Sequence, residues 1–179
     1  MLLDNYYKLF RLMVTSSHNS STSSTSIPSA FRPITTSGTT VSSYTQKTPF
    51  QSRSLMWSPL YNGIRAQNAG YSSGNLGEHS DILIGTGSTA AQASNYKMES
   101  QITTNIACTA VGFTISDDCK RYTVTKTFQN TSEEGLVIRE IGFMAGCNEG
   151  LFLVAREVLA EPLTVEAGKV FNISFTFDF

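Results

Sequence analysis

Hydrophobic and polar positions alternate most clearly at the C-terminal end of the chain. Four phenylalanines and one isoleucine mark the apolar positions from residue 171 onwards, and polar residues fill the positions between them. Successive side chains of a β-strand point to opposite faces, so this period of two predicts a strand with one apolar and one polar face. We expect Phe171, Phe175 and Phe177 to point into a core.

The same period appears upstream. In residues 122–128 large apolar side chains alternate with threonines, and Lys126 interrupts the apolar face. A shorter alternating run covers residues 111–115, and Asp117-Asp118 between the two runs is typical of a turn. A β-hairpin is therefore predicted here.

More strands are expected on both sides of this hairpin. A strand pair is predicted at 136–145 and 151–159, around a glycine-containing turn, with a short strand at 82–84 and a turn at 167–169. Turn signals recur about every 10–15 residues without a long helical period, which favours an all-β fold. We expect residues 76–179 to form an antiparallel β-sandwich of the jelly-roll or immunoglobulin-like type.

Residues 1–14 have a different pattern, because their apolar residues recur at helical spacing. A short amphipathic helix is predicted, and it allows two interpretations. The favoured one is docking on a partner through Tyr6 and Phe10. The other is packing on the helix's own domain.

Residues 15–75 form a Ser/Thr-rich segment, here called the arm. Residues 15–48 contain 20 serines and threonines in 34 positions. Such a composition buries too little apolar surface to offset its conformational entropy, so we expect an extended arm that is ordered only along neighbouring subunits. Removing residues 1–60 should then leave the β domain folded. Isolated aromatic residues are the candidate contacts with other chains: Phe31, Tyr44, Phe50 and Trp57.

Charge is distributed unevenly. Residues 1–70 carry six basic residues and one acidic residue (+5), and residues 71–179 carry seven basic and thirteen acidic residues (−6). This division suits docking of one copy's arm on another copy's body, although a chance distribution also fits. The net charge of −1 gives no reason to expect a nucleic-acid partner.

Few residues have the pattern of a catalytic or metal site. His18 lies within the Ser/Thr tract, and His79 has only sequence neighbours to orient it. Gly85-Thr86-Gly87 follows a predicted strand but lacks the spacing of a phosphate-binding loop, so a tight turn is expected. The acidic pairs Asp117-Asp118 and Glu133-Glu134 are more typical of solvated turns than of cation sites. We therefore expect no enzymatic activity, cofactor or metal.

Other patterns concern structure and location. Arg139-Glu140 and Arg156-Glu157 occupy similar places in consecutive predicted strands, and cross-strand pairing of their opposite charges is expected. The cysteine spacings fit no zinc site, and the odd number of cysteines argues against a full disulfide framework. No run reaches the ~18 apolar residues of a membrane span, so no membrane association is expected.

Several segments of the body, in this order along the chain, resemble small virion proteins of tailed bacteriophages. The opening residues 3–8 are also similar to the start of such proteins. The resemblance covers about 95 residues of the body and the first ten residues, but not the arm. It is carried by the segments 84–90, 95–99, 123–130, 138–143, 153–157 and 162–168.

The resemblance implies a non-enzymatic structural subunit of a phage virion, assembled in the host cytoplasm. It would bind copies of itself and other virion proteins in the tail, neck or baseplate. One alternative is a capsid decoration or head-fibre protein. Another is a receptor- or glycan-binding module of a tail fibre, in which aromatic residues such as Tyr44 and Trp57 stack on sugars of a host surface.

Overall fold

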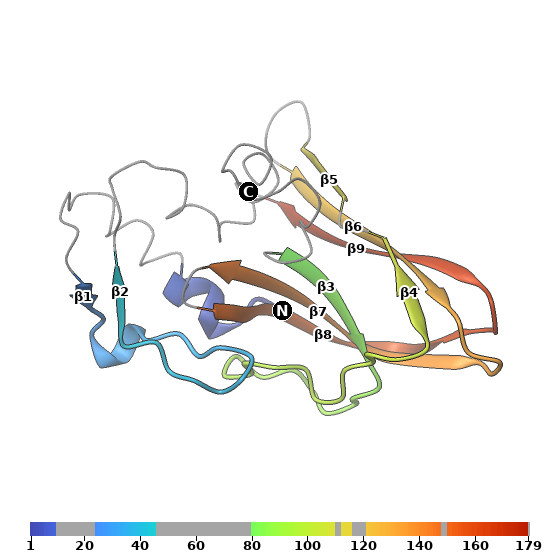
Figure 1. Ribbon diagram of the computed structural model, residues 1–179, viewed down its shortest axis with the longest axis horizontal. Coiled ribbons are helices and arrows are strands. Elements are labelled where there is room, and N and C mark those ends of the chain that lie inside the picture. The colour runs from blue at the N-terminus through green and yellow to red at the C-terminus, as the bar shows by residue number, and fades with distance from the viewer. Residues whose placement is uncertain (10–23, 46–79, 110–111, 116–120, 148–149, 179) are drawn as a thin grey trace.

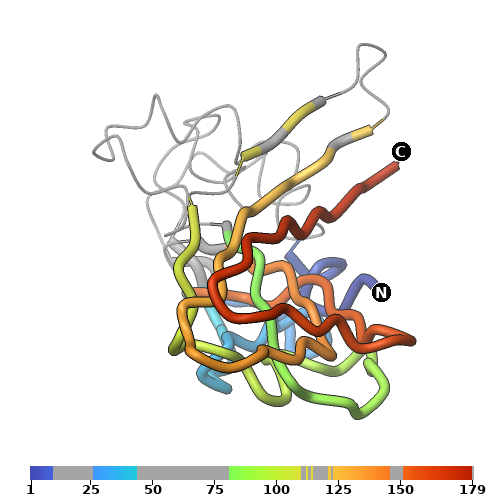
Figure 2. The backbone as a smooth tube through the Cα atoms, turned by 90° about the vertical axis from the view of Figure 1, so that its right-hand side faces the viewer, coloured from blue at the N-terminus to red at the C-terminus, as the bar shows by residue number. Residues whose placement is uncertain are grey.

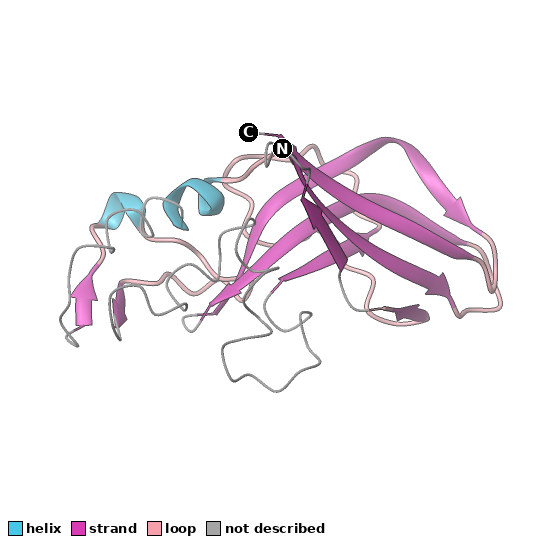
Figure 3. Cartoon of the chain, turned by 90° about the horizontal axis from the view of Figure 1, so that it is seen from above, coloured by secondary structure: helices cyan, strands magenta, loops and turns pink. Residues whose placement is uncertain are grey.

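The computed structural model describes residues 1–9, 24–45, 80–109, 112–115, 121–147 and 150–178 (Figure 1). Antiparallel β-strands make up most of this part of the chain, in two larger sheets and a two-stranded ribbon. The all-β expectation is therefore confirmed. Figure 3 shows the helical turn at residues 4–9 and the 3-10 turn η1 (Ser29–Phe31) together at one end of the molecule.

The first sheet has the strand order β3–β7–β8. The predicted pairing across the glycine-containing turn is confirmed, because β7 runs antiparallel to β8 along most of its length. The register shifts twice, once between Ile138 and Glu140 and once between Phe143 and Met144. The strands are β3 (Ser80–Gly85), β7 (Leu136–Cys147) and β8 (Gly150–Val165).

The second sheet is built around β6, which pairs with β9 from Arg121 to Gln129 (Figure 2). Since β9 occupies one edge of β6 over this length, β4 and β5 share the opposite edge, and the predicted pairing of β5 with β6 is confirmed. Gly168 has φ +72° in the predicted turn before β9. The strands are β4 (Ile106–Cys108), β5 (Gly112–Ile115), β6 (Arg121–Asn130) and β9 (Val170–Asp178).

One hydrophobic core lies between the two sheets. Phe143 of β7 lies 5.6 Å from Phe177 and 5.9 Å from Phe175 of β9, measured between ring centroids. Phe128 of β6 stacks on Phe171 at 5.3 Å. The alternation in the last strand therefore places its aromatic face against the core, as predicted, while Ser174 and its polar neighbours stay exposed.

The N-terminal residues pack on their own domain. Leu3 is fully buried and Leu9 is 3% exposed, each within a hydrophobic cluster of the body. Leu2 pairs with Ala155 at the outer edge of β8, and the Leu3 N–H donates to the Val154 carbonyl. The favoured expectation of a helix docked on a partner does not describe this structure. The apolar face finds its partner in the first sheet of the same chain.

The described part of the arm also folds on the body. Strands β1 (Ser24–Ser26) and β2 (Ser43–Thr45) form the antiparallel ribbon, and Ile27 beside it is 1% exposed. The Thr36 N–H donates to the Leu151 carbonyl of β8. The expectation of an extended arm held only by other subunits is wrong for residues 24–45, because backbone hydrogen bonds and a few apolar side chains compensate for the poor composition.

Residues 1–45 therefore contribute to the fold through their described segments. The expectation that deletion of residues 1–60 leaves the β domain intact conflicts with this structure, because the deletion would uncover the clusters that Leu3 and Leu9 complete. Loss of the buried side chains of Leu3 and Leu9 from these clusters would strongly destabilise the folded domain.

The contribution of β9 to the core can be measured at Phe177, which is 9% exposed. We expect Phe177→Ala to lower the free energy of unfolding by about 3–5 kcal/mol, because it removes buried contacts and leaves a cavity. Thr176→Ala, on the exposed face of the same strand, should cost less than about 1 kcal/mol. Urea titrations monitored by circular dichroism measure both, and equal losses for the two variants would contradict the assigned faces.

Candidate functional site

Six polar or charged residues are buried in the described part of the chain. An ionised or polar side chain is costly to bury unless it is paired or hydrogen-bonded, so each of these residues marks a place where the fold satisfies a specific requirement. They are Asn5, Thr35, Lys126, Asn130, Glu140 and Arg156.

The most deeply buried pair is Glu140 of β7 and Arg156 of β8. Their side chains are 0% and 2% exposed, and the Arg156 Nε donates to the Glu140 Oε2 at 2.7 Å. Arg156 lies opposite Gly142, two residues from Glu140, so the pair is diagonal across the two strands. The predicted cross-strand pairing is confirmed for these two residues, whereas Arg139 and Glu157 are exposed.

Glu140 is also bound by the backbone of the loop after β3. The Ser100 N–H donates to Oε1 at 2.7 Å, and the Glu99 N–H donates to Oε2 at 3.2 Å. A Cβ atom on Gly85 or Gly87 would lie 2.5 or 2.6 Å from the Glu140 Oε1. These glycines therefore allow the backbone to approach a buried carboxylate. They form no phosphate loop, since no helix follows within residues 86–105.

The guanidinium of Arg156 has three different acceptors. Besides Glu140, Nη1 donates to the Asn95 Oδ1 at 3.0 Å and Nη2 donates to the Glu99 Oε2 at 3.3 Å. Glu99 in turn accepts from the N–H and the hydroxyl of Thr89, both at 2.8 Å. We call Glu140, Arg156, Glu99 and Asn95 the arginine network. It joins β7 and β8 to the loop at 86–101.

Hydrogen bonds dominate the electrostatics of Glu99. The Thr89 hydroxyl and then the Thr89 N–H hold the pKa of Glu99 below its ordinary value of 4.5. Partial burial acts in the opposite direction, and the charge of Arg156 lowers the pKa further. The ionised carboxylate is therefore the form that the loop stabilises.

A second, partly buried ion pair connects the two sheets. Lys126, the residue that interrupts the apolar face of β6, is 6% exposed and its Nζ lies 2.5 Å from the Asp81 Oδ1 of β3. Its ammonium also lies 5.1 Å from the ring centroid of Phe128 and 3.5 Å from the Ile82 carbonyl. The pair thus supplies the charge partner that a lysine in a core needs.

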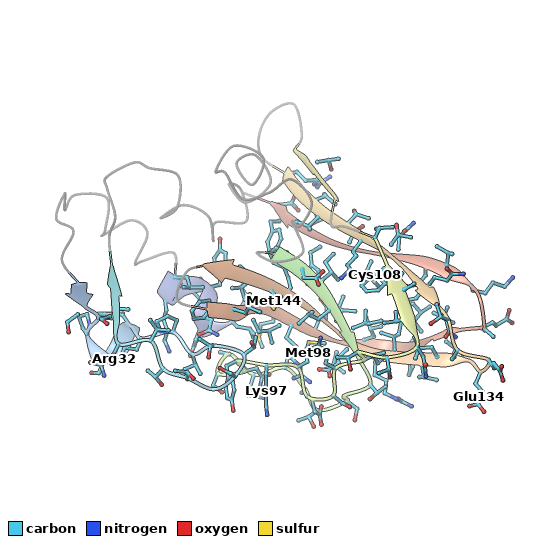
Figure 4. The ribbon with its side chains drawn as sticks, in the orientation of Figure 1. Arg32, Lys97, Met98, Cys108, Glu134 and Met144 are labelled. Carbon is cyan, nitrogen blue, oxygen red and sulfur yellow. The ribbon has the colours of Figure 1, made fainter. Side chains whose placement is uncertain are left out.

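A groove of about 470 Å³ is lined by residues of β3, β7, β8, the loop after β3 and the segment at 36–37. Figure 4 shows Met98 and Met144 near each other over the first sheet, with Lys97 at the loop side. Its volume is within the range of small-molecule sites, but the described residues of its lining include no aromatic side chain for sugar stacking. The lining residues are Thr36, Ser37, Asp81, Leu83, Lys97, Met98, Gln101, Met144 and Leu151.

The residues predicted to contact other chains are not gathered into one place. Tyr6 is half-buried and packs against the core, and Phe31 is half-buried in η1. Tyr44 lies in β2, but its side chain is not described. Phe10, Phe50 and Trp57 lie outside the described residues.

The residues considered as catalytic or metal-binding candidates are also not gathered into one site. His18, His79 and Asp117-Asp118 lie outside the described residues, and Glu133 and Glu134 are exposed. No group of three or more histidine, cysteine or acidic residues in the described part of the chain is placed to hold a metal ion. Cys108 is an exposed free thiol.

Sequence reasoning missed most of the arginine network. The pairing of Glu140 with Arg156 was readable from their strands, but Glu99 and Asn95 carried no signal beyond their place in a loop. The one available clue was Gly85-Thr86-Gly87, since two glycines beside a strand allow close backbone approach. Every charged group of the network is hydrogen-bonded to another group of the protein. The network therefore cross-links β7 and β8 to the loop at 86–101.

The contribution of the network can be measured by removing its cation. We expect Arg156→Met to destabilise the protein by about 3–5 kcal/mol, because the carboxylate of Glu140 would stay buried without its partner. The exposed neighbour in β7 provides the matched control, Arg139→Met, which should change the free energy of unfolding by less than about 0.5 kcal/mol. Chemical denaturation gives both values, and similar effects at the two positions would contradict a special role for the network.

Glu99 gives the network a dependence on pH. A carboxyl whose pKa is lower in the folded state stabilises that state fully above its ordinary pKa, and the contribution disappears as pH falls through the lowered value. The stability difference between the wild type and Glu99→Gln should therefore be greatest above about pH 5 and shrink in more acidic solution. Urea midpoints from about pH 7 to pH 2 test this. A difference that stays constant over the range would exclude the mechanism.

Among the described residues, no helix is long and apolar enough to cross a membrane. Comparisons of the chain with protein-family models, with curated proteins and with solved structures found no match.

Proposed function

We propose that this protein is a non-enzymatic structural subunit of a tailed-bacteriophage virion, present in multiple copies in the tail, neck or baseplate. We further propose that its two larger sheets form a β-sandwich of the jelly-roll or immunoglobulin-like type. The proposed partners are copies of the same chain and other virion proteins, and the proposed location is the virion assembled in the host cytoplasm.

The observation that carries the proposal is the arginine network. Four of the segments that resemble virion proteins meet at it: 84–90, 95–99, 138–143 and 153–157. Their charged groups bind one another within the fold, so these segments supply rigidity, which is the property that a load-bearing subunit needs.

The exposed face of the second sheet supports the same function. Hydroxyl and amide groups pair across β6 and β9, with Thr123 bound to Thr176, Thr125 to Ser174 and Thr127 to Asn172. This face is polar and carries one exposed ion pair, Arg121 with Asp178, at its end. Its cross-strand pairs stabilise the sheet without a ligand.

Two other functions remain candidates. One is a receptor- or glycan-binding module of a tail fibre, and the other is a capsid decoration or head-fibre protein. The groove gives no specific support to sugar binding, because the part of its lining that the structure describes lacks the aromatic faces on which sugars stack.

The proposal is tested on phage particles. They are purified by density gradient from an infected host that expresses the chain with a small tag. We expect the tagged chain in the particle fraction at a fixed ratio to the other virion proteins, by quantitative mass spectrometry, and located in the tail, neck or baseplate by electron microscopy. A chain abundant in the lysate but absent from particles would refute the proposal. A chain confined to the capsid surface would favour the decoration protein instead.

A further inference from the structure

The first residues of the chain act as an additional strand on the sheet. Leu2 forms an antiparallel bridge with Ala155, the Leu3 N–H donates to the Val154 carbonyl at 2.9 Å, and the Arg156 N–H donates to the Met1 carbonyl at 3.1 Å. These bonds cover the outer edge of β8, the last strand of its sheet. A strand edge of this kind binds an extended segment through backbone hydrogen bonds whatever chain the segment belongs to.

The position of the segment on β8 is specified by Asn5, which is 3% exposed. Its amide Nδ2 donates to the carbonyls of Leu153 and Ile34, and its Oδ1 accepts from the Ile34 N–H. One side chain therefore fixes the segment to both β8 and residues 27–41. A shift of the segment by one residue would break all three hydrogen bonds.

The site on the body is incomplete without this segment. Leu3 is buried in a cluster with Leu153 and Met144, and Leu9 is buried in the main core. Removal of residues 1–9 would expose this apolar surface to water and break the backbone hydrogen bonds at the edge of β8, which is costly. The surface is thus built to hold one specific partner segment.

The connection to the body is long enough to reach a neighbouring copy. Fourteen residues separate Leu9 from Ser24. Residues 10–14 belong to the predicted amphipathic helix, and the nine residues 15–23 span about 30 Å as an extended chain. Seven of the nine residues 15–23 are serine or threonine, so this stretch has no periodic apolar pattern in its sequence. Exchange between copies would preserve every contact described above. The equilibrium between docking on the same chain and docking on a second copy then depends on concentration alone.

We infer that residues 1–9 also dock on β8 of a second copy of this chain, so that exchanged N-terminal segments link neighbouring subunits. The inference rests on the proposed function, because it supplies the contact by which multiple copies join. Within one chain a tethered segment has an effective concentration of the order of millimolar, and subunits held in an assembly reach a comparable local concentration. Exchange therefore competes with intramolecular docking in the assembly and not in dilute solution.

Cysteine trapping tests the inference directly in the full-length chain, with Cys108, Cys119 and Cys147 replaced by serine. Bridged antiparallel partners have Cα atoms about 4.5–5.5 Å apart, within the range for a disulfide. A copy carrying Leu2→Cys is mixed at millimolar concentration with a copy carrying Ala155→Cys. A disulfide between the two copies then reports exchange, since neither copy can form it alone.

We expect about tenfold or more of this disulfide-linked dimer over a control in which Glu157→Cys, an exposed position of the same strand, replaces Ala155→Cys. A synthetic peptide of residues 1–9 provides a measurement without cysteines: the fluorescent peptide should bind the wild-type chain saturably, and a peptide with Leu3→Asp should not. No dimer above the control, together with no saturable peptide binding, would overturn the inference.

The double variant Leu2→Cys/Ala155→Cys separates this inference from the proposed function. When it is oxidised in dilute solution, the disulfide locks the segment on its own body. We expect the locked chain to be excluded from particles and the reduced chain to enter them. Normal incorporation of the locked chain would overturn the exchange and leave the structural role intact, whereas absence of the wild-type chain from particles would refute the structural role itself.

Discussion

The structure depends on the compensation of one buried charge. Glu140 has no exposed surface, and a carboxylate in that position is tolerated only with full hydrogen bonding and a cation beside it. Arg156 supplies the cation, and the backbone of the loop at 99–100 supplies two further donors. Because these groups come from two strands and a loop, satisfying the charge fixes the loop on the outer face of the first sheet.

This constraint extends to the N-terminal residues. The loop fixed by the network places Met98 over Gly142, where a side chain would collide with the Met98 sulfur. The same face of the sheet also receives Leu3, which shares a cluster with Met98. The buried pair, the glycine opposite it and the added N-terminal strand therefore form one continuous layer over the first sheet.

The two larger sheets meet through a different combination of forces. Aromatic side chains of β7 and β9 fill the space between them, and the Lys126–Asp81 pair spans the side where β3 borders β6. Removal of one partner of that pair would leave a charge in an apolar environment, whereas truncation of a phenylalanine removes contacts and leaves a cavity but no unpaired charge. The charged pairs therefore specify how the layers are arranged, and the apolar contacts supply most of the driving force.

The strands and their faces were determined by the sequence alone, because a period of two in apolar residues allows only one face of a strand to be buried. This holds for β9 and for β6 apart from Lys126, whereas the sequence indicated only the pairing of β7 with β8, because residues 152–156 of β8 are buried without alternation. Only the tertiary structure decided that Lys126 pairs with Asp81 and that Arg156 binds Glu99 and Asn95. The partner of a buried charge depends on which groups lie close in space and not on sequence spacing. Composition also misjudged residues 24–45. The few apolar side chains of this segment form no pattern that predicts folding. Its backbone groups and these side chains nevertheless hold it on the body, because β8 and Asn5 provide a surface that binds them.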